Sequence, residues 1–200
     1  MTKTLDFIFD FGSPNAYLAI KALPPVLERT GARLNVIPCL LGGIFKLTNN
    51  RAPLVAFADV KGKNAYDMLE IRRFVEKHAL SRFRLNPHFP VNTLRLMRGF
   101  LAAEELGVKD TYLEAGLAAM WEQGLKMDDP VVFAGALESN GLDAKAILAC
   151  AEEPRIKDRL AANTERAVAR GAFGIPTFFV GEDMFFGKER LAQIEEMLAA

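Results

Sequence analysis

Strand-like segments occur at both ends of this chain, with a helical block between them, and this order constrains the fold more than any other feature. Apolar side chains form a near-continuous run over 7–11, which is typical of a buried strand. A second strand is indicated over 34–37, closed by a predicted turn at 42–43. Near the other end, 177–180 and 184–186 indicate two more strands, and a final helix follows them. The pattern is therefore β-α-β at one end and β-β-α at the other.

Between these ends, from about Lys61 to Arg170, apolar side chains recur at helical spacing almost throughout. This order predicts an α/β, thioredoxin-like fold with an inserted all-helical domain. We expect 1–60 and 168–200 to form the thioredoxin-like domain, and 61–167 to form the inserted helical domain. In this plan the first and last strands belong to one mixed sheet.

The composition argues against nucleic acids, membranes and metal ions as binding partners of this protein. The 25 basic residues balance 25 acidic ones without a clustered basic excess, so no nucleic-acid partner is expected. No apolar run reaches membrane-spanning length and the start lacks a signal-peptide pattern, so we expect a cytoplasmic protein with no membrane partner. Cys39 and Cys150 stand alone, and with only His78 and His88 beside them no metal site is expected.

The junction of the first strand and first helix reads G-S-P-N-A. Redox members of the thioredoxin fold carry C-P-x-C here, but Ser13 and Ala16 replace both cysteines, so dithiol exchange at this site lacks its sulfur atoms. The helix N-terminus can still hold an anion, and the Ser13 hydroxyl can donate to a thiolate that another molecule supplies. The alternative is that Ser13 is only a helix N-cap.

Two further positions lie near the end of the chain. Pro176 directly precedes the returning strand, and we predict that the Ile175–Pro176 bond is cis, which would leave the Ile175 backbone free to pair with a peptide-like ligand. The alternative is a trans proline at the first residue of a strand. The last helix is predicted to begin at about Lys188, where free N–H groups suit a carboxylate. Glu189 either binds an ammonium group or only complements the helix dipole.

The stretches FDFGSPNAYLA, KGKNAYDM, NPHFPVNTLRLMRG and GAFGIPTFFVGEDMFFGKERL together resemble the 2-hydroxychromene-2-carboxylate isomerases. These are relatives of the kappa-class glutathione transferases in the DsbA-like group, and the resemblance covers nearly all 200 residues. It implies a homodimer that uses glutathione as cofactor in aromatic catabolism. The implied reaction converts 2-hydroxychromene-2-carboxylate to trans-o-hydroxybenzylidenepyruvate by reversible thiolate addition.

The resemblance also implies which residues bind glutathione. Ser13 would stabilise the thiolate, and Ile175, before Pro176, would pair with the cysteinyl backbone. The remaining implied contacts are Asn50 near the sulfur, Lys61 at a carboxylate, and Lys188 with Glu189 at the γ-glutamyl end. The family usually has aspartate where this chain has Glu189, and the looser KGKNAYDM stretch leaves Lys63 as an alternative to Lys61.

The implied substrate is a small aromatic carboxylate. Candidates for its apolar pocket are Phe57, Tyr66, Phe89, Met97 and Trp121. Met97 and Trp121 lie on periodic helical stripes, which favours a core role for both. Asn92 is a candidate polar contact and also a natural helix N-cap.

Three functions are compatible with these residues. The first is the glutathione-dependent isomerase. The second is a kappa-like glutathione S-transferase, which would consume glutathione on an electrophile. The third is a non-catalytic binding protein that keeps a thioredoxin-like cleft.

Overall fold

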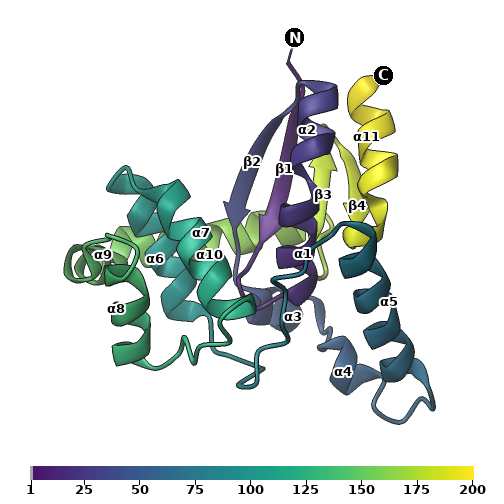
Figure 1. The fold of residues 1–200 in the computed structure, drawn as a ribbon. Helices are drawn as coiled ribbons and strands as arrows, with labels where there is room; N and C mark the ends of the chain where they lie inside the picture. The colour runs from purple at the N-terminus through teal and green to yellow at the C-terminus, as the bar shows by residue number, and fades with distance from the viewer. Residues whose placement is uncertain (1) are drawn as a thin grey trace.

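The computed structural model describes residues 2–200 and contains a four-stranded mixed sheet in the order β2-β1-β3-β4 (Figure 1). Its strands are β1 (Thr4–Phe9), β2 (Arg33–Pro38), β3 (Thr177–Val180) and β4 (Asp183–Phe186). β1 is parallel to β2 and antiparallel to β3, and β3 is antiparallel to β4. The first and last strands therefore share one sheet, as predicted, and the fold is thioredoxin-like.

Helices fill the rest of the chain. In the first half they are α1 (Pro14–Ala22), α2 (Pro24–Thr30), α3 (Leu41–Thr48), α4 (Pro53–Ala56), α5 (Lys63–Lys77) and α6 (Leu94–Glu105). In the second half they are α7 (Lys109–Trp121), α8 (Pro130–Glu138), α9 (Ala144–Ala151), α10 (Pro154–Ala169), the short 3-10 helix η1 (Lys188–Arg190) and α11 (Leu191–Ala199).

The turn predicted at Gly42 and Gly43 is wrong, because both glycines lie inside α3. The helix forms because of contacts with distant parts of the chain. The Asp10 carboxylate accepts a hydrogen bond from the Leu41 N–H and so caps the start of this helix. A Cβ at position 43 would lie 3.1 Å from the Thr164 methyl group, so glycine allows α3 to pack closely on α10.

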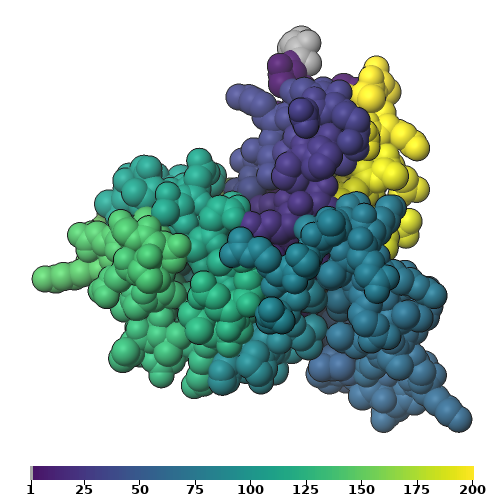
Figure 2. Space-filling model, viewed as in Figure 1, coloured from purple at the N-terminus to yellow at the C-terminus, as the bar shows by residue number. Residues whose placement is uncertain are grey.

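The helices form distinct groups around the sheet (Figure 1). Helices α1, α2 and α11 pack together on one face, while α10 passes behind β2 and contacts α3. Helices α6 to α9 form a lobe at the side of the sheet, seen in teal and green in Figure 2. Helix α5 lies apart from that lobe, near α1 and α11.

One hydrophobic core runs from the sheet into the lobe. Phe7 stacks on Phe178 at 4.6 Å between ring centroids, which joins β1 to β3. Phe9 and Phe11 both pack edge-to-face on Phe100 of α6, at 6.1 and 5.9 Å. This single core contains residues of both the predicted thioredoxin-like domain (1–60 and 168–200) and the predicted helical domain (61–167). The division into these two domains therefore stays a prediction.

Two features are absent from residues 2–200. No helix in this part of the chain is long and apolar enough to cross a bilayer. No group of three or more His, Cys, Asp or Glu side chains there is arranged to hold a metal ion.

Candidate functional site

Ser13 lies at the start of α1, directly after the turn that leaves β1, and its side chain is almost fully buried. Its Oγ accepts a hydrogen bond from the Ala16 N–H at 3.2 Å, so Ser13 is a helix N-cap. The same hydroxyl donates to the carbonyl oxygen of Ile175 at 2.9 Å. Capping alone needs only the acceptor, so the bond to Ile175 gives Ser13 a second role at the junction of the two chain ends.

The first turn of α1 carries unsatisfied polar groups. Pro14 at its first position has no N–H, and the Asn15 N–H has no hydrogen-bond partner within residues 2–200. In the same described part, the buried Asn15 Oδ1 also lacks a partner. Unpaired N–H groups at a helix N-terminus attract anions, so this end of α1 suits a negatively charged ligand atom.

The Ile175–Pro176 peptide bond is cis, as predicted. The Pro176 carbonyl accepts from the Gly187 N–H at 3.0 Å, which joins this segment to the end of β4. The Ile175 carbonyl accepts from Ser13, whereas the Ile175 N–H has no partner among residues 2–200. One backbone donor beside Ser13 is therefore available to a ligand.

Asn50 reaches the same region from the far end of α3. Its Nδ2 donates to the Phe173 carbonyl at 2.8 Å, and its Oδ1 accepts from the Arg51 N–H. The contact ties the segment after α3 to the residues before Ile175.

The two candidate lysines differ in their partners. Lys63 forms an ion pair with Asp67 one helical turn away, and its Nζ lies 5.1 Å from the centre of the Phe57 ring. Lys61 is exposed, and within residues 2–200 it has no ion-pair partner. The free charge of Lys61 makes it the better candidate for a ligand carboxylate.

Lys188 and Glu189 form an ion pair at the start of η1. The Lys188 side chain is buried, with its ammonium 5.3 Å from the centre of the Phe74 ring on α5, while the Glu189 side chain is half exposed. Lys188 thus fixes η1 against α5. Glu189 is the member of the pair that a ligand can reach.

The candidate substrate residues separate into core and surface. Met97 and Trp121 are fully buried, which assigns both to the core. Phe57 and Tyr66 are exposed, and half-buried Phe89 lies against Trp121 with 6.1 Å between ring centroids. Asn92 is exposed and its Oδ1 accepts from the Leu94 N–H at 3.0 Å, so it helps to cap α6.

Sequence reasoning missed Asp10, although it lies three positions before Ser13. The Asp10 side chain is fully buried, and this burial raises the pKa of its carboxyl group. Interactions with Leu41, Gly12 and Thr93 lower the pKa but do not cancel the effect of burial. A charged residue inside the apolar run FIFDF was the available signal, because an acid buried there needs hydrogen-bond donors.

Trp121 also has an unexpected polar contact. Its indole Nε1 donates to the Phe11 carbonyl at 2.8 Å, two positions before Ser13. Helix α7 therefore holds the same turn from the side of the helical lobe.

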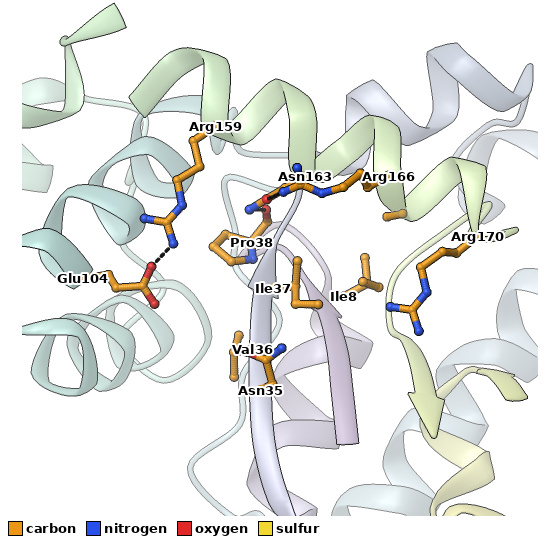
Figure 3. Close-up of a pocket in the computed structure, with 11 residues that line it drawn as sticks. Ile8, Asn35, Val36, Ile37, Pro38, Glu104, Arg159, Asn163, Arg166 and Arg170 are labelled. Atoms are coloured by element: carbon orange, nitrogen blue, oxygen red, sulfur yellow. Dashed lines mark hydrogen bonds and ion pairs between the residues drawn. The ribbon is translucent and has the colours of Figure 1, made fainter. Parts of the chain in front are cut away.

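A cavity of about 250 Å³ lies between α10 and β2, with Arg159, Arg166 and Arg170 along its α10 side (Figure 3). Arg159 is paired with Glu104, and Arg170 is paired with Asp6. A wider groove of about 630 Å³ lies between β4 and α11. As described for residues 2–200, neither lining includes a residue of the expected site.

Comparisons with known proteins agree with this architecture. A family model described as a DSBA-like thioredoxin domain matches residues 4–199. A 2-hydroxychromene-2-carboxylate isomerase from Sphingobium xenophagum is 27% identical over 198 residues, which is 99% of each chain. Glutathione S-transferase kappa 1 from Homo sapiens is 26% identical over 216 aligned positions, covering 99% of this chain and 92% of that protein.

The solved structures include a 2-hydroxychromene-2-carboxylate isomerase that superposes with a TM-score of 0.82. That protein is 26% identical to this one, and the match covers 98% of this chain and 94% of that chain. The resemblance to these isomerases is thereby confirmed at the level of sequence and fold, and the chain belongs to the DsbA-like thioredoxin-domain family.

Proposed function

We propose that this protein is a glutathione-dependent isomerase of the 2-hydroxychromene-2-carboxylate type. The observation that carries the proposal is the pairing of Ser13 with Ile175 at a helix N-terminus where the redox cysteines are replaced by Ser13 and Ala16. A site of this kind stabilises a sulfur anion without supplying one. The similarity to proteins named as these isomerases, over nearly the full chain, supports the same reaction.

Bound glutathione would supply a thiolate that adds reversibly to the substrate and is regenerated. Ser13 is suited to stabilising that thiolate, because its hydroxyl can turn from the Ile175 carbonyl toward a stronger, charged acceptor. The unpaired Asn15 N–H adds a second donor at the same helix end.

The other proposed contacts surround this point. The free Ile175 N–H, beside Pro176, would bind the cysteinyl backbone of glutathione. Asn50 would lie near the sulfur, and Lys61 would bind a carboxylate. Lys188 and Glu189 would hold the γ-glutamyl end, with Glu189 receiving the ammonium group, because the buried Lys188 ammonium already faces Phe74.

The substrate we propose is a small aromatic carboxylate. Phe89 would contact its ring, with Tyr66 and Asn92 nearby. Tyr66 lies on α5, and Phe89 and Asn92 lie on the segment between α5 and α6.

The test is an isomerisation assay with purified protein, 2-hydroxychromene-2-carboxylate and glutathione. We expect formation of trans-o-hydroxybenzylidenepyruvate, a strict requirement for glutathione, and an unchanged concentration of free thiol after many turnovers. Product formation at the same rate without glutathione would refute glutathione dependence.

A kappa-like glutathione transferase is the second candidate, favoured by the similarity to glutathione S-transferase kappa 1. Loss of free thiol in step with consumption of an electrophile would favour it over the isomerase. A third possibility, a non-catalytic binding protein, would be favoured if calorimetry detected no binding of glutathione.

We also propose a cytoplasmic homodimer. Large apolar side chains are exposed along the chain from the end of α3 to the start of α5, and this region projects in blue in Figure 2. They are Leu47, Leu54, Val55, Phe57, Val60, Tyr66 and Met68. Several large apolar side chains exposed on one projecting segment favour a subunit interface. Light scattering tests the oligomeric state, and a monomer at micromolar concentration would contradict the homodimer.

A further inference from the structure

Asp10 is a fully buried carboxyl group with no role in the function proposed above. It follows the last residue of β1 and lies three positions before Ser13. Burying an ionisable group is costly unless hydrogen bonds compensate for the lost water. The partners of this carboxylate therefore indicate what it does.

Those partners come from three segments of the chain. Oδ1 accepts from the Gly12 N–H at 2.8 Å, and Oδ2 accepts from the Leu41 N–H at 2.7 Å. The Thr93 side chain lies beside the same turn, and its hydroxyl lowers the pKa of the Asp10 carboxyl group against the effect of burial. The Asp10 backbone carbonyl also accepts from the Ser13 N–H at 3.2 Å. One residue thus joins the turn before α1, the start of α3 and the segment before α6.

The contact to Leu41 extends this influence along α3. The residue before this helix, Leu40, has no capping side chain, so the Asp10 carboxylate takes that role from another strand. Asn50 lies just beyond the end of α3 and bonds to the Phe173 carbonyl. Asp10 is therefore connected to Ser13 through the turn and to Asn50 through α3.

We propose that Asp10 is a positioning residue, which sets the orientation of the Ser13 turn relative to α3 and thereby aligns the two sides of the thiolate site. This inference rests on the proposed function for its effect on turnover. The hydrogen bonds by which Asp10 fixes the turn before α1 do not depend on any ligand.

Asparagine is the informative replacement. An amide keeps the shape of the carboxylate but has one oxygen acceptor, so one of the Gly12 and Leu41 N–H groups would face an NH₂ group. A buried donor left without an acceptor is destabilising, so the turn or the start of α3 must move. Asp6→Asn is a matched control, because Asp6 lies on β1, four positions before Asp10, and bonds to Asn35 and Arg170 away from Ser13.

The experiment compares wild type, Asp10→Asn and Asp6→Asn by amide hydrogen exchange without ligand. We expect faster exchange at residues 11–16 and 41–50 in Asp10→Asn alone. With glutathione, we expect kcat to fall on the order of tenfold or more, with a smaller change in KM for glutathione. A general loss of structure would not produce this split between kcat and KM.

Thr93→Val provides a second variant if Asp10→Asn does not fold. It removes one neighbour of the carboxylate and should change the same quantities in the same direction, by less. Wild-type exchange in the variant, or wild-type kcat in an active protein, would overturn the proposal. If wild type does not bind glutathione, the proposed function fails, and the exchange comparison still decides whether Asp10 holds the turn.

Discussion

The hydroxyl of Ser13 donates a hydrogen bond of 2.9 Å to the carbonyl oxygen of Ile175, which lies 162 positions further along the chain. The bond connects the first turn of α1 to the segment that enters β3. A serine hydroxyl has one proton, so the proton that would serve a thiolate is held by Ile175 in the free protein. Ligand binding at this site therefore exchanges one hydrogen bond for another.

Replacing Ser13 with alanine should affect bound glutathione and stability separately. Without the hydroxyl, the pKa of the bound thiol should rise by about one to two units, since a hydrogen bond to a charged group contributes about 1.5–3 kcal/mol. Turnover should slow, while glutathione still binds through its other contacts. Loss of the cap should lower the free energy of unfolding by about 1 kcal/mol.

Ultraviolet titration of the bound thiolate, isomerisation rates and urea unfolding measure these effects. Ser139→Ala is the control, because Ser139 makes a local hydrogen bond to the Ala136 carbonyl at the end of α8. If Ser13→Ala keeps both the thiolate pKa and the rate, Ser13 is only a helix cap.

Lys61 and Lys63 should contribute unequally to glutathione affinity. Lys61→Ala should raise the Kd for glutathione about two- to fivefold, the range expected for an exposed ion pair. Lys63→Ala should change it less, because Lys63 is already paired with Asp67. Calorimetry at low and high salt tests this, since the Lys61 effect should shrink as salt screens the charge. A larger effect at Lys63 would assign the contact to that residue.

Much of the fold follows from local pattern. The strands were predictable because each is a short and mostly apolar segment. Helix α3 was not, because two adjacent glycines read locally as a turn and only the Asp10 cap and the approach to Thr164 favour the helix. Tertiary contacts of this kind leave no periodic trace in the sequence.

The site shows the same division. Ser13 and Ile175 were predictable because a serine before a helix and a proline before a strand have clear local patterns. The burial of Asp10 and Lys188 was not, because it depends on which segments meet around them. Trp121 is fully buried, in agreement with the core role that its helical stripe favours.

Cys39 should be inert in the native protein. It is fully buried, and burial, with the nearby Asp10 charge, raises the pKa of its thiol to about 12. The reactive thiolate is thus scarce at pH 8. A Cys150→Ser variant, which keeps only Cys39, should react with a thiol reagent at the rate of unfolding and quickly in denaturant.

The raised pKa of the Cys39 thiol also determines how the stability of the protein depends on pH. The contribution of Cys39 to stability is complete below the thiol pKa of the unfolded chain and is lost as pH rises toward about 12. Stoichiometric labelling of the native Cys150→Ser protein within minutes at pH 8 would contradict this burial.

Two helical glycines should respond to alanine in opposite directions. A Cβ at Gly116 on α7 would lie 2.6 and 2.8 Å from two atoms of the Phe11 ring, whose backbone carbonyl is held by Trp121. Gly116→Ala should therefore lower the free energy of unfolding by about 1–3 kcal/mol through overpacking. Gly135 on α8 has no atom within 4 Å of such a Cβ, so Gly135→Ala should raise it by about 0.5–1 kcal/mol through helix propensity. Urea unfolding measures the stability of both variants. Because Phe11 leads directly into Gly12 and Ser13, Gly116→Ala should also slow turnover, whereas Gly135→Ala should not. Equal stability of the two variants would mean that Phe11 can move away at little cost and that α7 does not fix the Ser13 turn.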